Sequence, residues 1–220
     1  MSKQKIALVT GGLSGEAQIS YKSAQTVGTH IDRNIYDVYT IDIQPSGWWF
    51  VDERGELTPV DKNDFSVVSG GEKTKFDLAL MCIHGTPGED GKLQGYFDLL
   101  GIPYTSCDAA TSALTMNKRY TVAVAAFGGI HVARSLHLFR HTPVAPETIL
   151  AQLSLPLFVK PNSGGSSIGM SKVNAAQELG PALEKAFRED AQLLVEEFIS
   201  GREFTIGVFK QGNLIEVLPI

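Results

Sequence analysis

The chain has 220 residues, of which 43% are hydrophobic and 20% are charged. This is ordinary globular usage, so the composition excludes collagen-like, coiled-coil and wholly disordered chains. At this length roughly 70% of the surface of the unfolded chain is buried on folding, which is enough for one large domain or two small ones. The formal net charge of −5 argues against nucleic acid as the main partner.

Neither a membrane segment nor a metal-binding cysteine pattern is visible. No apolar run approaches the roughly 20 residues that span a bilayer, and the first residues, MSKQKIALVTGG, hold too short an apolar stretch for a signal peptide. We therefore expect a cytoplasmic protein that binds no membrane. The two cysteines, Cys82 and Cys107, predict neither a disulfide framework nor a zinc site. Cys82 lies in an apolar run, so a reduced core thiol is expected there.

The first part of the chain alternates strands with helices, which predicts parallel βαβ units. Apolar runs at 5–10, 36–43 and 76–83 are typical of strands, and the last is apolar enough to be covered on both faces. A glycine turn follows the first run and a helix is expected after it. Ser14 is expected to cap that helix, with Glu16 in its first turn.

Two further elements complete the predicted N-terminal domain, which we place at residues 1–103. GWWFVDERGELTPV at 47–60 predicts a hairpin lying over the sheet, with Arg54 and Gly55 in its turn and its two tryptophans covering the core. KLQGYFDLLGIPY at 92–104 predicts a helix that Gly101 ends.

The pattern then changes to hairpins, which predicts a second, α+β unit. One alanine-rich helix is expected within 112–130, followed by a connector that contains Pro143 and Pro146. The remaining expected elements are strands at 154–161 and 170–173 joined by a glycine-serine loop, a helix at 175–190, and strands at 193–200, 203–210 and 214–220. Because the last run continues to Ile220, we expect the chain to be a fragment of a longer protein.

The most informative segment is FVKPNSGGSSIGMSKV at 158–173. Its glycines let the backbone approach an anion closely, and Ser166 and Ser167 add hydroxyl donors. No Gly-Lys-Ser/Thr closes the loop and a strand follows it, so this is no Walker P-loop. Lys160 precedes the loop instead, which is typical of a hairpin flap folding over a nucleotide. An ordinary glycine-serine connection is the alternative.

Three other segments carry candidate polar groups. GGLSGE at 11–16 lacks the dinucleotide fingerprint, and Glu16 can either hold a substrate ammonium group or merely cap a helix. His84 follows the third strand, where it can donate to a carboxylate or shuttle a proton. Glu89 and Asp90 are expected to cap the next helix. VEEFISGREF at 195–204 is either the adenine and ribose side of a nucleotide site or a solvated strand end.

These motifs, in this order, resemble the D-alanine–D-alanine ligases of the ATP-grasp superfamily. The matching segments are GGLSGEAQIS, HGTPGEDGKLQG, GIPYTSC, SALTMNK, FVKPNSGGSSIGMSKV and VEEFISGREFT. The resemblance implies an α/β fold with a pre-ATP-grasp parallel-sheet domain at 1–103. An α+β ATP-grasp domain follows, incomplete at its C-terminus, with a small subdomain carrying the flap at 104–191 and the start of the C-terminal subdomain at 192–220.

The resemblance also implies roles for individual residues. Glu16 and Ser166 match the catalytic pair that orients the ammonium group of the first D-alanine, and His84 matches a histidine near that substrate. The residues implied in ATP binding are Lys118, Lys160, Ser166, Ser167, Glu196, Glu197, Phe198, Ile199 and Glu203. Asn117 stands where the family usually has an aspartate, and Val122 where a second lysine is common, departures that we regard as peripheral.

The implied activity is the ATP-dependent joining of two D-alanines through an acyl phosphate, for peptidoglycan precursors and hence cell shape. It implies ATP and Mg²⁺ (or Mn²⁺) as cofactors, a homodimer, and no metal ligand within 1–220, so that these 220 residues alone are expected to be inactive. Two alternatives stay open: a ligase that takes D-lactate or D-serine as second substrate, and a non-catalytic nucleotide-binding module.

Overall fold

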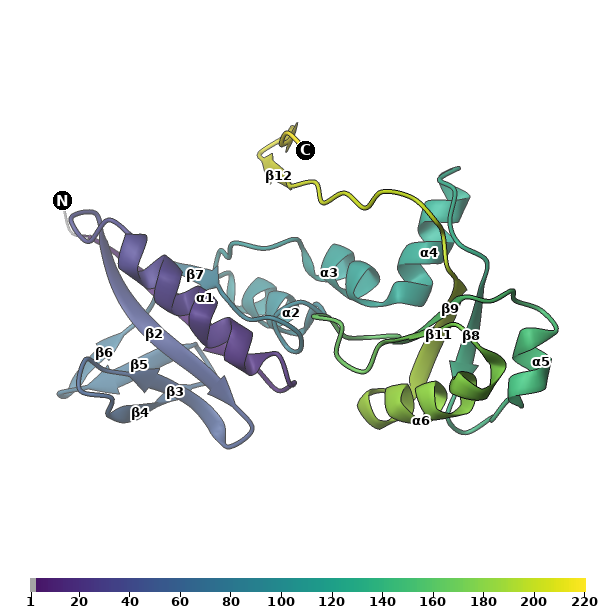
Figure 1. Ribbon diagram of the computed structural model, residues 1–220. Helices are drawn as coiled ribbons and strands as arrows, with labels where there is room; N and C mark the ends of the chain where they lie inside the picture. The colour runs from purple at the N-terminus through teal and green to yellow at the C-terminus, as the bar shows by residue number, and fades with distance from the viewer. Residues whose placement is uncertain (1–2) are drawn as a thin grey trace.

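The computed structural model describes residues 3–220 and shows two α/β bodies, each built on its own sheet (Figure 1). The sheet of the first body runs in the order β6-β5-β4-β3-β2-β1-β7. Strands β2, β1 and β7 pair in parallel, and the others continue the sheet in antiparallel pairs. The strands are β1 (Gln4–Gly11), β2 (Tyr36–Gln44), β3 (Gly47–Val51), β4 (Leu57–Asp61), β5 (Ser66–Ser69), β6 (Glu72–Thr74) and β7 (Leu78–Met81).

Helices α1 (Ala17–His30) and α2 (Lys92–Leu100) pack on opposite faces of this sheet. Alternate residues of a strand point to opposite faces, so Leu8 of β1 packs with α1, whereas Ala7 and Val9 share a core with Phe97 of α2. Cys82 is buried on the α1 side, as predicted. The three predicted parallel strands and both helices of this body are confirmed.

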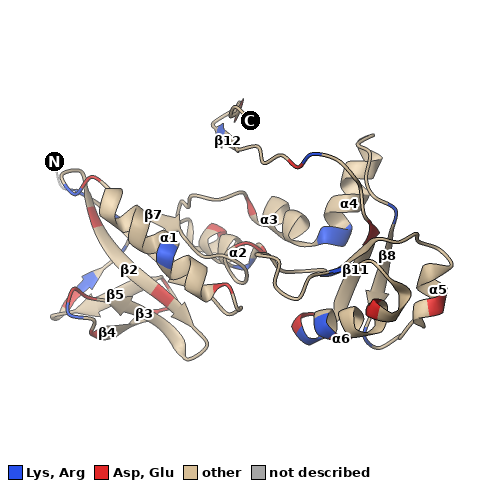
Figure 2. Cartoon of the chain, in the orientation of Figure 1, with Lys and Arg blue, Asp and Glu red and all other residues tan. Residues whose placement is uncertain are grey.

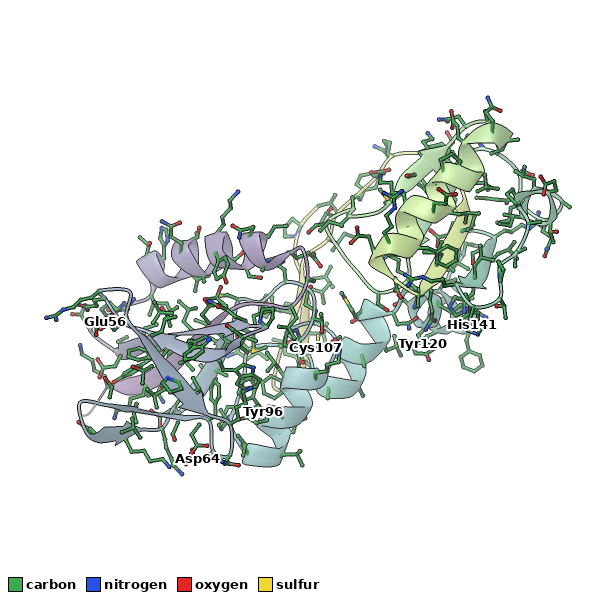
Figure 3. The ribbon with its side chains drawn as sticks, turned by 90° about the horizontal axis from the view of Figure 1, so that it is seen from below. Glu56, Asp64, Tyr96, Cys107, Tyr120 and His141 are labelled. Carbon is green, nitrogen blue, oxygen red and sulfur yellow. The ribbon has the colours of Figure 1, made fainter. Side chains whose placement is uncertain are left out.

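The hairpin of β3 and β4 lies beside the sheet and not over it, so that prediction was wrong. β3 pairs with β2, which makes the hairpin the antiparallel continuation of the same sheet. Trp48 packs edge-on against Phe65 and Tyr96, whose ring centroids lie 6.1 Å and 5.1 Å from its own. The apolar residues of the hairpin therefore complete the α2 side of the core without covering a separate layer. Figure 3 shows Tyr96 in this body, with Tyr120 and His141 in the other.

The single alanine-rich helix predicted within 112–130 is two helices, α3 (Ala109–Met116) and α4 (Lys118–Phe127). Between them Asn117 has extended backbone, and its side-chain oxygen accepts the N–H of Tyr120 at 3.0 Å. Asparagine is a strong N-cap residue, so it starts a new helix here and does not continue the first. The family's usual aspartate would accept the same bond, which makes Asn117 a mild departure.

The second body has an antiparallel sheet in the order β10-β9-β11-β8. Helix α6 (Leu179–Glu189), preceded by the short helix η1 (Ala176–Glu178), packs its apolar face on this sheet. The sheet and its smaller helix consist of β8 (Ser135–Phe139), α5 (Pro146–Leu150), β9 (Leu157–Pro161), β10 (Ser171–Val173) and β11 (Gln192–Glu197). β8 and α5 lie in the segment for which only a connector was predicted. The strand was missed because it is short and has a histidine in its middle.

After β11 the chain leaves the second body as an extended segment that ends in the hairpin of β12 (Val208–Gln211) and β13 (Leu214–Val217) (Figure 1). The side chains of this hairpin are exposed. The strand predicted at 203–210 begins only at Val208. Among residues 3–220, none of the helices combines the length and apolarity that crossing a membrane requires.

Candidate functional site

The glycine-serine loop at 163–169 connects β9 to β10 and extends toward the first body. Ser166 and Ser167 both have left-handed backbone, with φ of 49° and 57°, and both side chains are exposed. Left-handed backbone is uncommon outside glycine and asparagine, so two consecutive serines in it mark a loop of unusual shape. The predicted strand, loop and return strand are confirmed as local structure.

Ser166 contacts Glu16 of the first body. The Ser166 hydroxyl donates to Oε1 of Glu16 at 2.8 Å, although the two residues are 150 positions apart in the chain. Glu16 is only 4% exposed and its carboxylate makes no capping bond to the helix that begins at Ala17. Ser14 accepts the N–H of Glu16 at 3.2 Å and does not cap the helix in the predicted way. The Glu16 carboxylate is thus directed away from the helix and toward the loop.

The loop approaches Glu16 too closely for a side chain at Gly165. A Cβ built there would lie 2.7 Å from Oε1 of Glu16, a distance that real Cβ atoms essentially never show. Gly85, at the end of the first body's third parallel strand, is equally constrained: its Cβ would lie 2.8 Å from Oε2 of Glu16. Two glycines therefore allow the carboxylate to sit between the loops of the two bodies.

Two lysines line a cavity of about 250 Å³ beneath the loop. Lys118 is the first residue of α4 and Lys160 lies on β9, and Figure 2 shows basic residues at the start of α4. The ammonium group of Lys118 donates to the carbonyl of Gly164. Burial, and then the charge of Lys160, lower the pKa of Lys118. A cavity with two ammonium groups and a glycine-serine loop is suited to a polyphosphate.

The two glutamates of β11 have different partners. Glu196 forms an ion pair with Lys160, and both side chains are largely buried. Glu197 accepts the N–H of Ser154 at 2.7 Å and lies 3.4 Å from the guanidinium of Arg134, away from the lysine cavity. Of these two glutamates, Glu196 is therefore the one that contacts a lysine of the cavity.

The other predicted nucleotide residues lie beyond β11. The ring of Phe198 lies 5.8 Å from that of Phe158, and the ammonium group of Lys172 lies 3.7 Å from the centroid of the Phe198 ring. Ile199 is 66% exposed, and Glu203 is exposed in the extended segment. The structure thus brings Phe198 to the edge of the sheet that carries Lys160, but it does not bring Ile199 and Glu203 into the cavity.

His84 faces α1. Its Nε2 lies 2.9 Å from the hydroxyl of Ser23, and its backbone N–H donates to the hydroxyl of Ser20 at 2.9 Å. The prediction that Glu89 caps α2 was wrong, because its carboxylate accepts the N–H of Gly85 at 2.6 Å. Glu89 instead stabilises the tight turn after His84, next to Glu16.

A second cavity, of about 220 Å³, lies between the two bodies. It is lined by Ser14, Glu16, Thr86, Asp90, Lys92, Met116, Ser163, Gly164, Glu189 and Asp190. Asp190 was not predicted from the sequence, yet its carboxylate accepts the N–H of Ser163 at 2.7 Å and so anchors the loop. Asn162, at the base of the loop, was also missed. Neither has a local signal, because both act on backbone groups distant in the chain.

The residues from 3 to 220 do not offer a magnesium site. Within this range no group of three or more histidine, cysteine, aspartate or glutamate side chains is arranged to hold a metal ion. Glu196, the carboxylate that contacts Lys160, is already paired with that lysine. The donor set therefore does not fit the metal, and we derive no step through it.

Comparison with known proteins agrees with this architecture in both parts of the chain. A family model described as D-ala D-ala ligase N-terminus matches residues 5–107, and one described as D-ala D-ala ligase C-terminus matches residues 118–220. A D-alanine–D-alanine ligase of Phocaeicola vulgatus is 44% identical over 218 residues, which are 99% of this chain and 67% of the relative. One of Parabacteroides distasonis is also 44% identical, over 99% of this chain and 66% of the relative.

Solved structures of the same group have the same fold. D-alanyl-alanine synthetase A from Vibrio cholerae matches 99% of this chain and 66% of its own with a TM-score of 0.86 at 30% identity. The VanG D-Ala:D-Ser ligase from Enterococcus faecalis matches 98% and 68% with a TM-score of 0.83 at 35% identity. The fold is that of a ligase. The chain belongs to the D-alanine–D-alanine ligase family, and it spans about two thirds of the length of the relatives that it matches.

Proposed function

We propose that the complete gene product joins two D-alanines at the expense of ATP, with the site between the two bodies carrying the first step. The observation that supports this best is the hydrogen bond from Ser166 to Glu16. This bond holds the glycine-serine loop against the buried carboxylate of Glu16. A nucleotide bound under the loop and an amino acid bound at the carboxylate would therefore be neighbours. D-Alanine as substrate and peptidoglycan precursors as product follow from the family.

In the proposed reaction the chemistry begins at the carboxylate of the first D-alanine. One of its oxygens attacks the γ-phosphorus of ATP, the bond to the bridging oxygen breaks, and ADP leaves. The amine of the second D-alanine then attacks the acyl carbon of the acyl phosphate, phosphate departs with the bonding electrons, and the amine loses a proton. Activation is required because a carboxylate is a poor electrophile, whereas phosphate is a good leaving group.

The residues of this chain would bind and orient the reactants. Glu16 would hold the ammonium group of the first D-alanine, with His84 close to that substrate and Ser166 fixing the carboxylate of Glu16. The ammonium groups of Lys118 and Lys160 and the N–H groups of the loop would neutralise charge on the phosphates, which is the main contribution in phosphoryl transfer. Phe198, Ile199 and the acidic residues Glu196 and Glu203 would contact the adenosine.

The remaining assignments extend the same proposal. Ser167 and Glu197 would complete the nucleotide contacts, and Mg²⁺ would be held by residues other than those described. ATP as a substrate implies the cytoplasm, and a homodimer remains a prediction from the family resemblance.

The test is phosphate release from ATP by the complete gene product. Release should require D-alanine and be much slower with L-alanine, because an enantiomer cannot present its ammonium and carboxylate groups to Glu16 and the loop together. Equal rates with both enantiomers would contradict the proposal. ATP binding without phosphate release would favour a nucleotide-binding module, and faster release with D-serine or D-lactate added to D-alanine would identify a different second substrate.

A further inference from the structure

Asn162 is a fully buried polar residue at the base of the glycine-serine loop. It follows the last residue of β9, and its backbone N–H donates to the carbonyl of Gln192 at 2.9 Å. Its own carbonyl accepts the N–H of Lys118 at 3.0 Å, and its side-chain Oδ1 accepts the N–H of Arg119 at 2.9 Å. Asn162, which directly follows a strand of the second sheet, therefore accepts hydrogen bonds from the first two backbone N–H groups of helix α4.

These bonds matter because of where they fall on the helix. The first four N–H groups of an α-helix have no partner within it and need acceptors from elsewhere. In α4 the side chain of Asn117 takes only the N–H of Tyr120. The donors of Lys118 and Arg119 depend on Asn162, so the start of α4 is joined to the base of the loop and not merely capped by its own sequence.

The other end of the Asn162 side chain makes no such bond. Its Nδ2 is buried and has no acceptor among residues 3–220. Burying an unpaired donor is unfavourable, so packing alone does not explain an asparagine at this position. The Oδ1 atom is the useful part of the side chain, and what it contacts is the helix that carries Lys118.

The side chain of Lys118 returns to the same loop. Its ammonium group donates to the carbonyl of Gly164, two residues after Asn162, in the cavity that Lys160 also lines. Two like charges in one cavity repel each other, which favours conformations in which one lysine moves out. Holding Lys118 beside Lys160 therefore requires that the backbone of Lys118 be fixed.

We propose that Asn162 is the positioning residue that holds Lys118 in the phosphate site. Its carbonyl, bound to the N–H of Lys118, and its Oδ1, bound to the N–H of Arg119, together fix the start of α4 against the base of the loop, so that both lysine ammonium groups face the same anion. This role rests on the proposed function, because it takes Lys118 to be a phosphate ligand.

The experiment compares nucleotides that differ in their phosphates. Binding of ATP and of adenosine to the complete gene product is measured by titration calorimetry, for the unchanged protein and for Asn162→Ala. This variant removes the side-chain bond to the N–H of Arg119 and keeps the main-chain bond to the N–H of Lys118, so it tests the part of the anchor that the side chain supplies. We expect the Kd for ATP to rise about tenfold, the change produced by losing one well-placed contact, whereas the Kd for adenosine stays within about twofold. Asn162→Ser should be intermediate, because its hydroxyl keeps an acceptor on a shorter side chain.

The matched control is Asp108→Ala. Asp108 caps the start of α3 by accepting the N–H of Thr111 at 2.7 Å, whereas the opposite end of this helix, at Met116, lines a cavity with the loop. Its loss therefore removes a similar capping bond from the helix end that lies away from the loop. This variant should lower the melting temperature but leave the ratio of the two Kd values unchanged. An equal change in that ratio would mean that helix destabilisation alone explains the Asn162 result, and it would overturn the proposal.

A double-mutant cycle tests whether Asn162 acts through Lys118. In the Lys118→Ala background, Asn162→Ala should weaken ATP binding by less than about twofold. A second tenfold loss would overturn the proposal, as would parallel losses for ATP and adenosine in Asn162→Ala alone. If Asn162→Ala does not fold, the same comparisons are made with Asn162→Ser. If the unchanged protein binds adenosine and ATP equally, the proposed function fails, and the failure is distinguishable from that of the positioning role.

Discussion

At the scale of single residues, Glu16 joins the two bodies because its carboxylate accepts a hydrogen bond from the hydroxyl of Ser166. Sequence reasoning alone left Glu16 undecided between a helix cap and a substrate ligand. The structure places Glu16 at the N-cap position of α1 but shows no capping bond from its side chain, whose carboxylate contacts Ser166 instead. The substrate role still rests on the family resemblance, because no property of a lone glutamate reveals which residue 150 positions away will contact it.

Replacing Glu16 with glutamine keeps its shape and removes its charge. A hydrogen bond to a charged group contributes roughly 1.5–3 kcal/mol, so Glu16→Gln should raise the KM for the first D-alanine about tenfold to hundredfold. The affinity for ATP should change little. Steady-state kinetics with each substrate varied in turn gives both values, and a large loss of ATP affinity would contradict the assigned role.

Tyr96 gives a prediction about pH. Its hydroxyl donates to the carbonyl of Lys62 at 2.8 Å, and burial, followed by the charges of Asp64 and Asp61, raises its pKa to about 12. A phenol whose pKa is higher in the folded state than its ordinary value of 10.0 stabilises the fold below pH 10. That contribution is lost as the pH rises through about 12.

Removing the hydroxyl should therefore remove part of this pH dependence. Tyr96→Phe is expected to lower stability near neutral pH, through the lost hydrogen bond, and to flatten the decline above about pH 10. Urea denaturation midpoints measured across this range check the prediction, with the exposed Tyr120 changed to phenylalanine as the control. Parallel curves for the Tyr96 variant and the unchanged protein would refute it.

At the scale of elements, the glycine-serine loop offers a matched pair of substitutions. A Cβ at Gly165 would meet Glu16, whereas a Cβ at the neighbouring Gly164 has nothing within 4 Å. Gly165→Ala should therefore displace the loop and reduce kcat/KM for D-alanine by about tenfold or more, and Gly164→Ala should have a much smaller effect. The kinetics of the two variants settle this, and similar losses in both would show that closeness to Glu16 is not the cause.

How well the elements could be predicted depended on how local their signals are. β1, β2 and β7 have clear apolar runs, and the loop between β9 and β10 has its glycines and serines. The helix break at Asn117 was missed because a single asparagine within an alanine-rich pattern is a weak signal. β8 was missed because it is short, and its apolar residues alternate only around His137. The contacts of Asn162 and Asp190 have no sequence signal, since they depend on which segments the fold brings together.

At the scale of the molecule, the two bodies have separate cores. The core of the first contains Phe65, Phe97 and their neighbours, and that of the second contains Leu157, Leu193 and Val195, with no residue in common. Fully buried leucines typically stabilise a fold by 2–5 kcal/mol relative to alanine, with a cavity left behind by the change. Stability is therefore expected to be divided between the two bodies.

Leu193→Ala should thus destabilise the second body by about 2–5 kcal/mol and leave the first largely protected. Amide hydrogen exchange read by mass spectrometry resolves the two: peptides from β9, β11 and α6 should exchange faster, and those from β1 and α2 should not. The reciprocal variant, Phe97→Ala, should give the opposite pattern. Uniform acceleration across both bodies would mean that they unfold as one unit.

The left-handed backbone of Ser166 and Ser167 has a consequence for the proposed binding of a nucleotide. Restricting one residue to a single conformation costs roughly 1–2 kcal/mol of entropy, and a segment that is flexible before binding incurs this cost when its ligand arrives. Here the bend already exists and is secured from the opposite side by Glu16. Preorganisation of this kind transfers the ordering cost from association to folding. If the loop binds phosphate as we propose, its affinity would be partly determined before any phosphate is present.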